Sequence, residues 1–193
     1  MNHQTPIIIG IAGRARHGKD TLAQYLVQHH GFHQMAFADP IVDGLISMLD
    51  IPTEYRTDKK EDEVPGLGFS YRKAAQTLGT EWGRNLLDSD IWVNVMRRRI
   101  ADMADHNDRI VISDVRFPNE AAWLRDTVNG FVWHVHRPGV DCINRSDHAS
   151  EGGIDASDGE PMLMNVGDTP DQLYLQAFAL LSSLGLASGD VAA

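Results

Sequence analysis

A glycine-bracketed segment near the start of the chain, Gly13 to Thr21, has the residue types and spacing for phosphate chemistry. Four residues separate Gly13 from Gly18, and Lys19 comes next. Glycines at this spacing let backbone N–H groups face one anion, and the lysine adds a charge that can reach the β- and γ-phosphates of a nucleotide. The pattern predicts a phosphate-binding P-loop, and the alternative is a glycine-rich turn with a solvated lysine.

The position after the lysine departs from the usual P-loop pattern. Ser or Thr is expected there because its hydroxyl binds Mg²⁺. This chain has Asp20 at that position and Thr21 one place later. Thr21 is thus the candidate hydroxyl ligand, either for the metal or for phosphate.

A second candidate site follows the apolar run Ile110 to Ile112, which leads to Ser113 and Asp114. Such a run predicts a buried parallel strand, whose end places Asp114 at the carboxyl edge of the sheet beside the P-loop. There the carboxylate can hold Mg²⁺ directly or through water. Arg116 follows two residues later, and Glu120 lies in the first turn of a helix predicted to begin at Pro118.

A third candidate is a polar stripe on a helix predicted to begin after Ser70. Arg72, Gln76 and Thr80 recur every four residues and so share one helix face. Their donors suit phosphate and base edges, and the alternative is an ordinary polar face. We expect Gly79 to interrupt this helix and leave its backbone N–H available to a ligand. The apolar face predicted to be core comprises Tyr71, Ala74, Ala75, Leu78, Trp82 and Leu86.

The polar segment 51–68 has two interpretations. One is a surface loop, as most mixed-charge runs are. The other is a binding lid, because an insert of this length in a compact domain often closes over a ligand. In that case Arg56, Lys59 and Lys60 can meet phosphate.

Two histidines on a later strand raise a further alternative. His134 and His136 share one strand face, which fits either a metal pair without an evident third ligand or ordinary packing. A triad of Asp147, His148 and Ser150 is conceivable, but no nucleophile elbow marks it.

The elements that must position these residues follow an alternating order. Apolar runs predict strands, and apolar residues at helical spacing predict helices between them. We expect a three-layer α/β/α sandwich with a parallel central sheet, an arrangement similar to that of P-loop kinases, forming a single domain over 1–193. Within it we expect a helical acceptor-binding and lid region at about 38–108 and a loose tail at 186–193. The predicted strands cover residues 7–12, 32–37, 109–114, 130–136 and 162–166.

Composition narrows the function classes. The 193 residues carry a net charge of −10, so the surface as a whole should repel nucleic acid. The single cysteine, Cys142, excludes an internal disulfide and a cysteine-rich zinc site. We find no apolar run of membrane-spanning length and no signal peptide, and we expect a cytoplasmic protein without membrane partners.

Together these segments resemble the phage-type deoxynucleoside monophosphate kinase family of P-loop kinases. The P-loop alone indicates only the superfamily, whereas the combination of segments is more specific. The resemblance extends in order from about Ile7 to the final predicted helix. It rests on Gly13–Thr21, Ala38–Ile41, Arg72, Gln76–Glu81, Ile91–Val93, Ser113–Arg116 with Glu120, Arg137–Gly139 and His148–Glu151.

The resemblance implies ATP-dependent phosphorylation of a deoxynucleoside monophosphate to the diphosphate, with Mg²⁺ as cofactor. Lys19, Arg72, Asp114 and Arg116 would then be catalytic, and Thr21 and Asp114 would meet the metal, Asp114 directly or through water. ATP would contact Gly13, Arg16, Gly18, Lys19, Asp20, Thr21 and Arg137. The acceptor would contact Asp39, Pro40, Ile41, Arg56, Arg72, Gln76, Gly79, Thr80, Trp92, Asp114, Arg116 and Glu120.

One position departs from the family pattern. Members can carry a lysine just after the Pro-Ile pair of the acceptor helix, and this chain has Val42 there. Arg56 or Lys59 is the candidate substitute for gripping phosphate.

The resemblance also implies that the partners are small-molecule nucleotides and that a homodimer is a candidate oligomeric state. It implies the host cytoplasm as location if the chain is phage-encoded. Two other functions stay open at this stage. One is a different small-molecule P-loop kinase, of the dephospho-coenzyme A or sugar-acid type. The other is an ATP-binding regulator without transfer activity.

Overall fold

The computed structural model describes residues 6–103, 109–140 and 153–187. The chain divides into two compact units, one made of Met1–Ala36 and Arg98–Ala193 and the other of Phe37–Arg97. The second unit overlaps the helical region predicted at about 38–108. From residue 188 onward the predicted tail lies outside the described residues, as does the segment with Cys142 and the conceivable triad.

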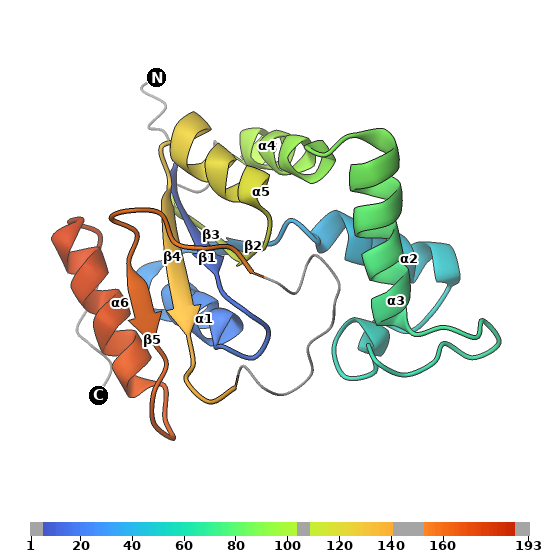
Figure 1. The fold of residues 1–193 in the computed structure, drawn as a ribbon, viewed down its shortest axis with the longest axis horizontal. Coiled ribbons are helices and arrows are strands. Elements are labelled where there is room, and N and C mark those ends of the chain that lie inside the picture. Colours follow the sequence, from blue (N-terminus) through green and yellow to red (C-terminus); the bar gives the residue numbers. More distant parts are fainter. Residues whose placement is uncertain (1–5, 104–108, 141–152, 188–193) are drawn as a thin grey trace. The chain divides into compact units, whose positions relative to one another are not determined.

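The first unit is built on a five-stranded sheet in which every pair of neighbouring strands is parallel (Figure 1). Its strands are β1 (Ile7–Ala12), β2 (His33–Met35), β3 (Arg109–Val115), β4 (Phe131–His136) and β5 (Met162–Met164). The spatial order is β2-β3-β1-β4-β5, so β1 lies between β3 and β4. All five predicted strands are confirmed, and so is the parallel central sheet.

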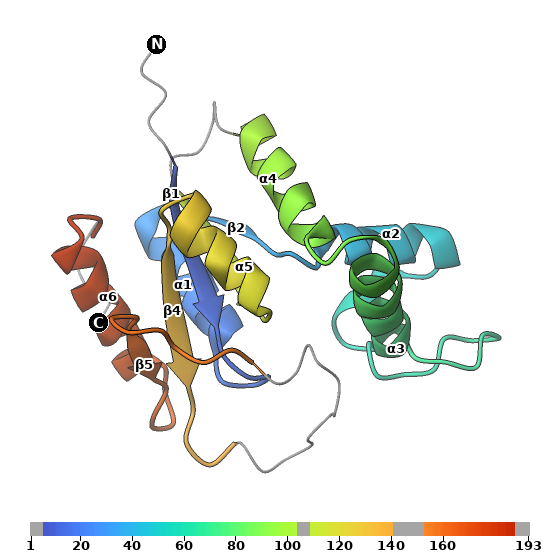
Figure 2. The ribbon, with the colours of Figure 1, turned by 45° about the horizontal axis from the view of Figure 1, so that its top comes forward.

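Helices cover both faces of this sheet, as Figures 1 and 2 show for α1 and α5. On one face, Ile9 and Ile11 are fully buried against residues of α1 (Lys19–His30) and α6 (Asp171–Ser183). Gly10 points to the other face, where a Cβ atom would meet Leu124 of the π-helix η3 (Trp123–Thr127), which continues α5 (Pro118–Ala122). The three-layer α/β/α class is therefore confirmed.

The second unit is helical. It contains α2 (Asp39–Leu49), the 3-10 helix η1 (Thr53–Arg56), α3 (Tyr71–Gln76), the π-helix η2 (Thr77–Leu87) and the start of α4 (Ile91–Met103). The α3 helix begins as predicted, because the Ser70 hydroxyl accepts a hydrogen bond from the Lys73 backbone N–H at 3.3 Å.

Two predictions for this helix are wrong. Gly79 does not interrupt it, since α3 passes directly into η2 and Gly79 is buried inside η2. The predicted apolar face does not all form core either, because Trp82 is 44% exposed and Leu86 is 75% exposed. The reason is the winding: a π-helix turns less per residue than an α-helix, so residues spaced for one α-helical face leave that face.

The described helices include none whose length and apolar character would let it cross a membrane.

Candidate functional site

The predicted P-loop connects β1 to α1, as a phosphate-binding loop requires. Gly13 has a φ of 145° and Gly18 a φ of 106°, conformations that favour glycine. A Cβ atom on Gly13 would lie 2.5 Å from the Val135 carbonyl oxygen of β4, so glycine is also required for space. The neighbouring strand β4 thus requires glycine at Gly13, and the conformation at the start of α1 favours glycine at Gly18.

Lys19 is the first residue of α1 and is only 8% exposed. Its ammonium donates a hydrogen bond to the Arg14 carbonyl oxygen at 2.9 Å. The positive charge therefore lies over the backbone of the loop itself, at the positive end of the helix dipole, where an anion is favoured.

Two further side chains hold the loop from outside. The ring of His17 is 2% exposed, and its Nδ1 lies 3.3 Å from the Val135 carbonyl oxygen. Asn165, which follows β5, donates from Nδ2 to the His17 carbonyl oxygen at 2.9 Å. Neither residue was singled out from the sequence, because each contact joins positions more than a hundred residues apart.

Asp114 lies near the end of β3, and β3 pairs with β1 so that Val115 is opposite Ala12. The carboxylate is therefore carried at the edge of the sheet from which the P-loop departs. It is half-buried, and the preceding residue, Ser113, is buried and accepts a hydrogen bond from Gln34 of β2 at 3.0 Å. The predicted placement of Asp114 beside the P-loop strand is confirmed, whereas its role stays a prediction.

Glu120 fixes the turn that carries Arg116. Its carboxylate is 2% exposed and accepts hydrogen bonds from the backbone N–H groups of Arg116 at 2.7 Å and Phe117 at 3.0 Å. These contacts cap the start of α5. The contacts give Glu120 a structural role, and its predicted contact with the acceptor is not tested by them.

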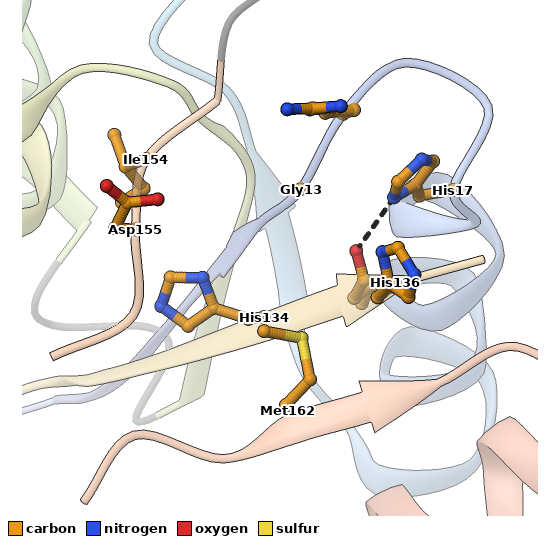
Figure 3. Close-up of a pocket in the computed structure, with 9 residues that line it drawn as sticks. Gly13, His17, His134, His136, Ile154, Asp155 and Met162 are labelled. Atoms are coloured by element: carbon orange, nitrogen blue, oxygen red, sulfur yellow. Dashed lines mark hydrogen bonds between the residues drawn. The ribbon is translucent and has the colours of Figure 1, made fainter. Parts of the chain in front are cut away.

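A pocket of about 220 Å³ lies beside the first residues of the P-loop (Figure 3). His134 and His136 enter it from β4 and His17 enters it from the loop, with Ile154 and Asp155 on the side away from His17. The rings of His17 and His136 meet edge to face, 5.2 Å apart. Gly13, Arg14, Val135 and Met162 complete the lining.

His134 is held in this pocket by the half-buried carboxylate of Glu160. Its Nε2 lies 2.9 Å from Glu160, which also accepts hydrogen bonds from the Arg125 guanidinium and from the Ser157 backbone N–H. Burial raises the pKa of Glu160, but the hydrogen bonds from Arg125, Ser157 and His134 outweigh this and lower the pKa to about 2. The carboxylate is therefore ionised at neutral pH.

Of the two histidines of β4, His134 thus hydrogen-bonds to Glu160 and His136 packs against the ring of His17. Within the described ranges, three or more His, Cys, Asp or Glu side chains nowhere gather in a way that could hold a metal ion. The interpretation as packing residues agrees with the structure, since His134 is 3% exposed.

In the second unit, two predicted acceptor-binding arginines pair with carboxylates. Arg56 lies 3.0 Å from Asp43 and 3.3 Å from Asp39, so its guanidinium lies along α2, the helix that carries Val42. Arg72 pairs with Glu61. Both guanidinium groups thus have carboxylate partners within this unit.

The remaining predicted acceptor residues of this unit lie on α2, the α3–η2 helix and α4. Trp92 is 7% exposed, and its indole N–H donates to the Gly79 carbonyl oxygen at 2.7 Å. Gly79 and Gly83 leave room for Ile41 and Trp92 respectively. Ile41 is buried, and the other four are half-buried: Asp39, Pro40, Gln76 and Thr80.

The remaining predicted ATP-binding residues lie on or near the loop. Arg16 is exposed with a φ of 65°, and Asp20 and Thr21 lie in the first turn of α1, exposed and half-buried respectively. Arg137 is exposed and directly follows β4, next to His136 of the pocket.

Comparison with known proteins gives a family match. The model of the deoxynucleotide monophosphate kinase family matches residues 54–175. The deoxynucleoside-5'-monophosphate kinase of Escherichia phage T5 is 36% identical over 131 residues, covering 66% of this chain and 52% of that protein. This chain thus spans about half the length of the phage T5 protein. The match to the family model does not include the P-loop, whose assignment rests on its geometry.

A candidate deoxynucleotide monophosphate kinase from Acanthamoeba polyphaga mimivirus is 28% identical over 191 residues, covering 92% of this chain and 97% of that protein. Among solved structures, TT1252 from Thermus thermophilus has a TM-score of 0.54 at 18% identity, with 96% and 100% of the two chains covered. An unliganded sugar kinase from Janibacter has a TM-score of 0.52 at 13% identity, with the same coverage. These structural similarities support the fold alone.

Proposed function

This chain belongs to the deoxynucleotide monophosphate kinase family, and we propose that it transfers the γ-phosphoryl group of ATP to a deoxynucleoside monophosphate. The observation that carries the proposal is the edge of the parallel sheet, where the loop that leads to Lys19 leaves β1 and Asp114 lies near the end of the neighbouring β3. That edge is where open α/β sheets bind their ligands.

On the donor side, we propose that the loop binds the ATP phosphates through backbone N–H groups and Lys19. Gly13 and Gly18 shape the loop, and Asp20 and Thr21 begin the helix whose positive end faces the anion. Arg16 and Arg137 are the proposed additional contacts to ATP, because both are exposed close to the loop or to its pocket.

The residues present fit Mg²⁺, which prefers oxygen ligands and keeps several waters and phosphate oxygens in its shell. The half-buried Asp114 carboxylate and the Thr21 hydroxyl are the proposed protein ligands, with Asp114 acting directly or through water. The ion would neutralise phosphate charge when bound.

On the acceptor side, we propose that the monophosphate binds residues of the helical unit together with Asp114, Arg116 and Glu120. An acceptor phosphate would replace Glu61 as the partner of Arg72. Arg56 is the proposed substitute for the lysine absent at Val42, because its guanidinium already lies along α2. The further proposed contacts are Asp39, Pro40, Ile41, Gln76, Gly79, Thr80 and Trp92.

The chemical step needs little from the protein beyond position and charge. An oxygen of the acceptor phosphate attacks the γ-phosphorus, a new P–O bond forms, and the bond to the bridging oxygen breaks to release ADP. Lys19, Arg72 and Arg116 are the proposed groups that offset the repulsion between the two polyanions. A strong general base is unnecessary because the attacking phosphate oxygen is already ionised.

The partners we propose are small nucleotides rather than nucleic acid or membrane, and a homodimer is the oligomeric state to test first. We propose the cytoplasm as the location, which is the host cytoplasm if the chain is phage-encoded.

The test is a panel of acceptors. We expect purified protein with Mg-ATP to release ADP when a deoxynucleoside monophosphate is added, and not with dephospho-coenzyme A or a sugar acid. Activity with one of the latter would replace the proposal by another small-molecule kinase. ATP binding without turnover for any acceptor would indicate a regulator instead.

A further inference from the structure

We propose that Asn165 is a positioning residue that sets the orientation of the His17–Gly18 peptide in the P-loop, so that the Gly18 N–H faces the bound phosphate. This inference rests on the proposed function only in that the loop must bind phosphate. It concerns a residue that lies far from the loop in sequence, after β5.

The backbone of Asn165 is itself fixed. Its N–H donates to the His136 carbonyl oxygen at 2.8 Å, which extends the pairing of β5 with β4 by one residue. The residue is 8% exposed, so its side chain has little freedom. The amide therefore approaches the loop from a rigid part of the sheet.

The side chain meets the loop at one peptide group. Nδ2 of Asn165 donates to the His17 carbonyl oxygen at 2.9 Å, and a Cβ atom added to Gly18 would lie 2.4 Å from the same nitrogen. Because the partner is a carbonyl, which accepts only, the amide must present its NH₂ group. On the other side of the same residue, the His17 ring is held at the Val135 carbonyl.

The planarity of the peptide bond links this contact to the orientation of a backbone N–H group in the anion site. A trans peptide is planar, with its C=O and N–H pointing in opposite directions. Holding the His17 carbonyl toward Asn165 therefore directs the Gly18 N–H away from Asn165. Without that donor, the carbonyl could turn inward, because Gly18 tolerates backbone conformations that other residues avoid. An inward carbonyl would repel the phosphate that an inward N–H attracts.

The experiment compares Asn165→Asp and Asn165→Leu with a matched pair, Gln176→Glu and Gln176→Leu. Gln176 on α6 makes the same kind of bond, from its amide Nε2 to the Met164 carbonyl oxygen at 2.9 Å. Met164 precedes Asn165 directly, so the control lies in the same region but bonds to β5 rather than to the P-loop. The Leu variants remove the donor without adding a negative charge.

The primary readout is binding of inorganic tripolyphosphate and of ATP by calorimetry. We expect both Asn165 variants to lose roughly tenfold in affinity, as for the loss of one hydrogen bond to a charged group, and both Gln176 variants to stay within about twofold of the wild type. The second readout is the NMR resonance of the Gly18 backbone amide. It should shift on addition of tripolyphosphate in the wild type and the Gln176 variants, and much less in the Asn165 variants.

Unchanged affinity and an unchanged Gly18 response in the Asn165 variants would overturn the inference. Should Asn165→Asp fail to fold, the neutral Asn165→Leu decides in the same way. Failure of the proposed function is distinguishable, because phosphate binding is measured without an acceptor. A wild type that binds tripolyphosphate but phosphorylates no monophosphate would refute the kinase proposal alone. A wild type that binds neither anion would refute both.

Discussion

His134 Nε2 and the Glu160 carboxylate lie 2.9 Å apart, and both groups are largely withdrawn from solvent. The contact joins β4 to the segment that precedes β5, and Arg125 of η3 binds the same carboxylate. One ionised group thus ties three parts of the first unit together beside the pocket.

Glu160 should therefore make the stability of the first unit depend on pH. Because its pKa is lowered to about 2 in the folded chain, its contribution is present above the ordinary pKa of 4.5 and is lost as the pH falls through the range down to about 2. The difference corresponds to about 3 kcal/mol of unfolding free energy. We expect Glu160→Gln to lower that free energy at pH 7 and to flatten its dependence on pH between 5 and 2.

Urea unfolding at a series of pH values measures this. Glu63→Gln, which changes an exposed carboxylate, serves as the control and should keep the wild-type pH profile. If the unfolding free energy of the wild type does not fall below pH 4.5, the expected contribution of Glu160 is absent.

The elements and the first parts of the site follow from local sequence signals. Apolar runs and glycine spacing located β1, the P-loop and α1, and the apolar run before Asp114 located β3, because each signal lies within about a dozen residues. The contacts that hold the loop do not follow in this way. Asn165 and His17 are 148 positions apart in the sequence. His134 and Glu160 come together because β5, which follows Glu160, lies next to β4 in the sheet.

The exposed side chains of Trp82 and Leu86 illustrate a different limit. Their α-helical spacing predicted a core face, yet η2 has π-helical winding. The local spacing of apolar residues does not distinguish α-helical from π-helical winding. In the π-helix that forms, Gly79 lies close to Ile41 and Gly83 lies close to Trp92.

Lys19→Ala should nearly abolish phosphoryl transfer while leaving the fold intact. The ammonium lies over the loop backbone, so its loss removes charge stabilisation at the transferred phosphate, and we expect kcat to fall by roughly 10²–10³. Steady-state ADP release and a thermal melt measure the two effects. Lys73→Ala, at an exposed lysine on α3, is the control. Near-normal constants for Lys19→Ala would refute the P-loop assignment.

Arg116→Ala should impair the acceptor more than the donor. The backbone N–H of Arg116, which alanine keeps, donates to the Glu120 carboxylate, so this contact of the turn remains in the variant. We expect a higher KM for the monophosphate or a lower kcat, by roughly tenfold or more, with little change in ATP affinity. Arg97→Ala, at an exposed arginine of α4, is the control. Equal loss of ATP binding would assign Arg116 to the donor instead.

Gly83→Ala should destabilise the helical unit. A Cβ atom at Gly83 would lie 2.7 Å from Cζ2 of the Trp92 indole, which is itself held by its bond to the Gly79 carbonyl. The ring cannot move aside without breaking that bond, so we expect a loss of about 1–3 kcal/mol of unfolding free energy. Gly44→Ala in α2 is the matched control, because its Cβ would meet nothing within 4 Å. There the better helix propensity of alanine should add about 0.5–1 kcal/mol. Urea unfolding of both variants checks the opposite signs, and destabilisation by the two changes alike would show that contact with Trp92 is not the cause.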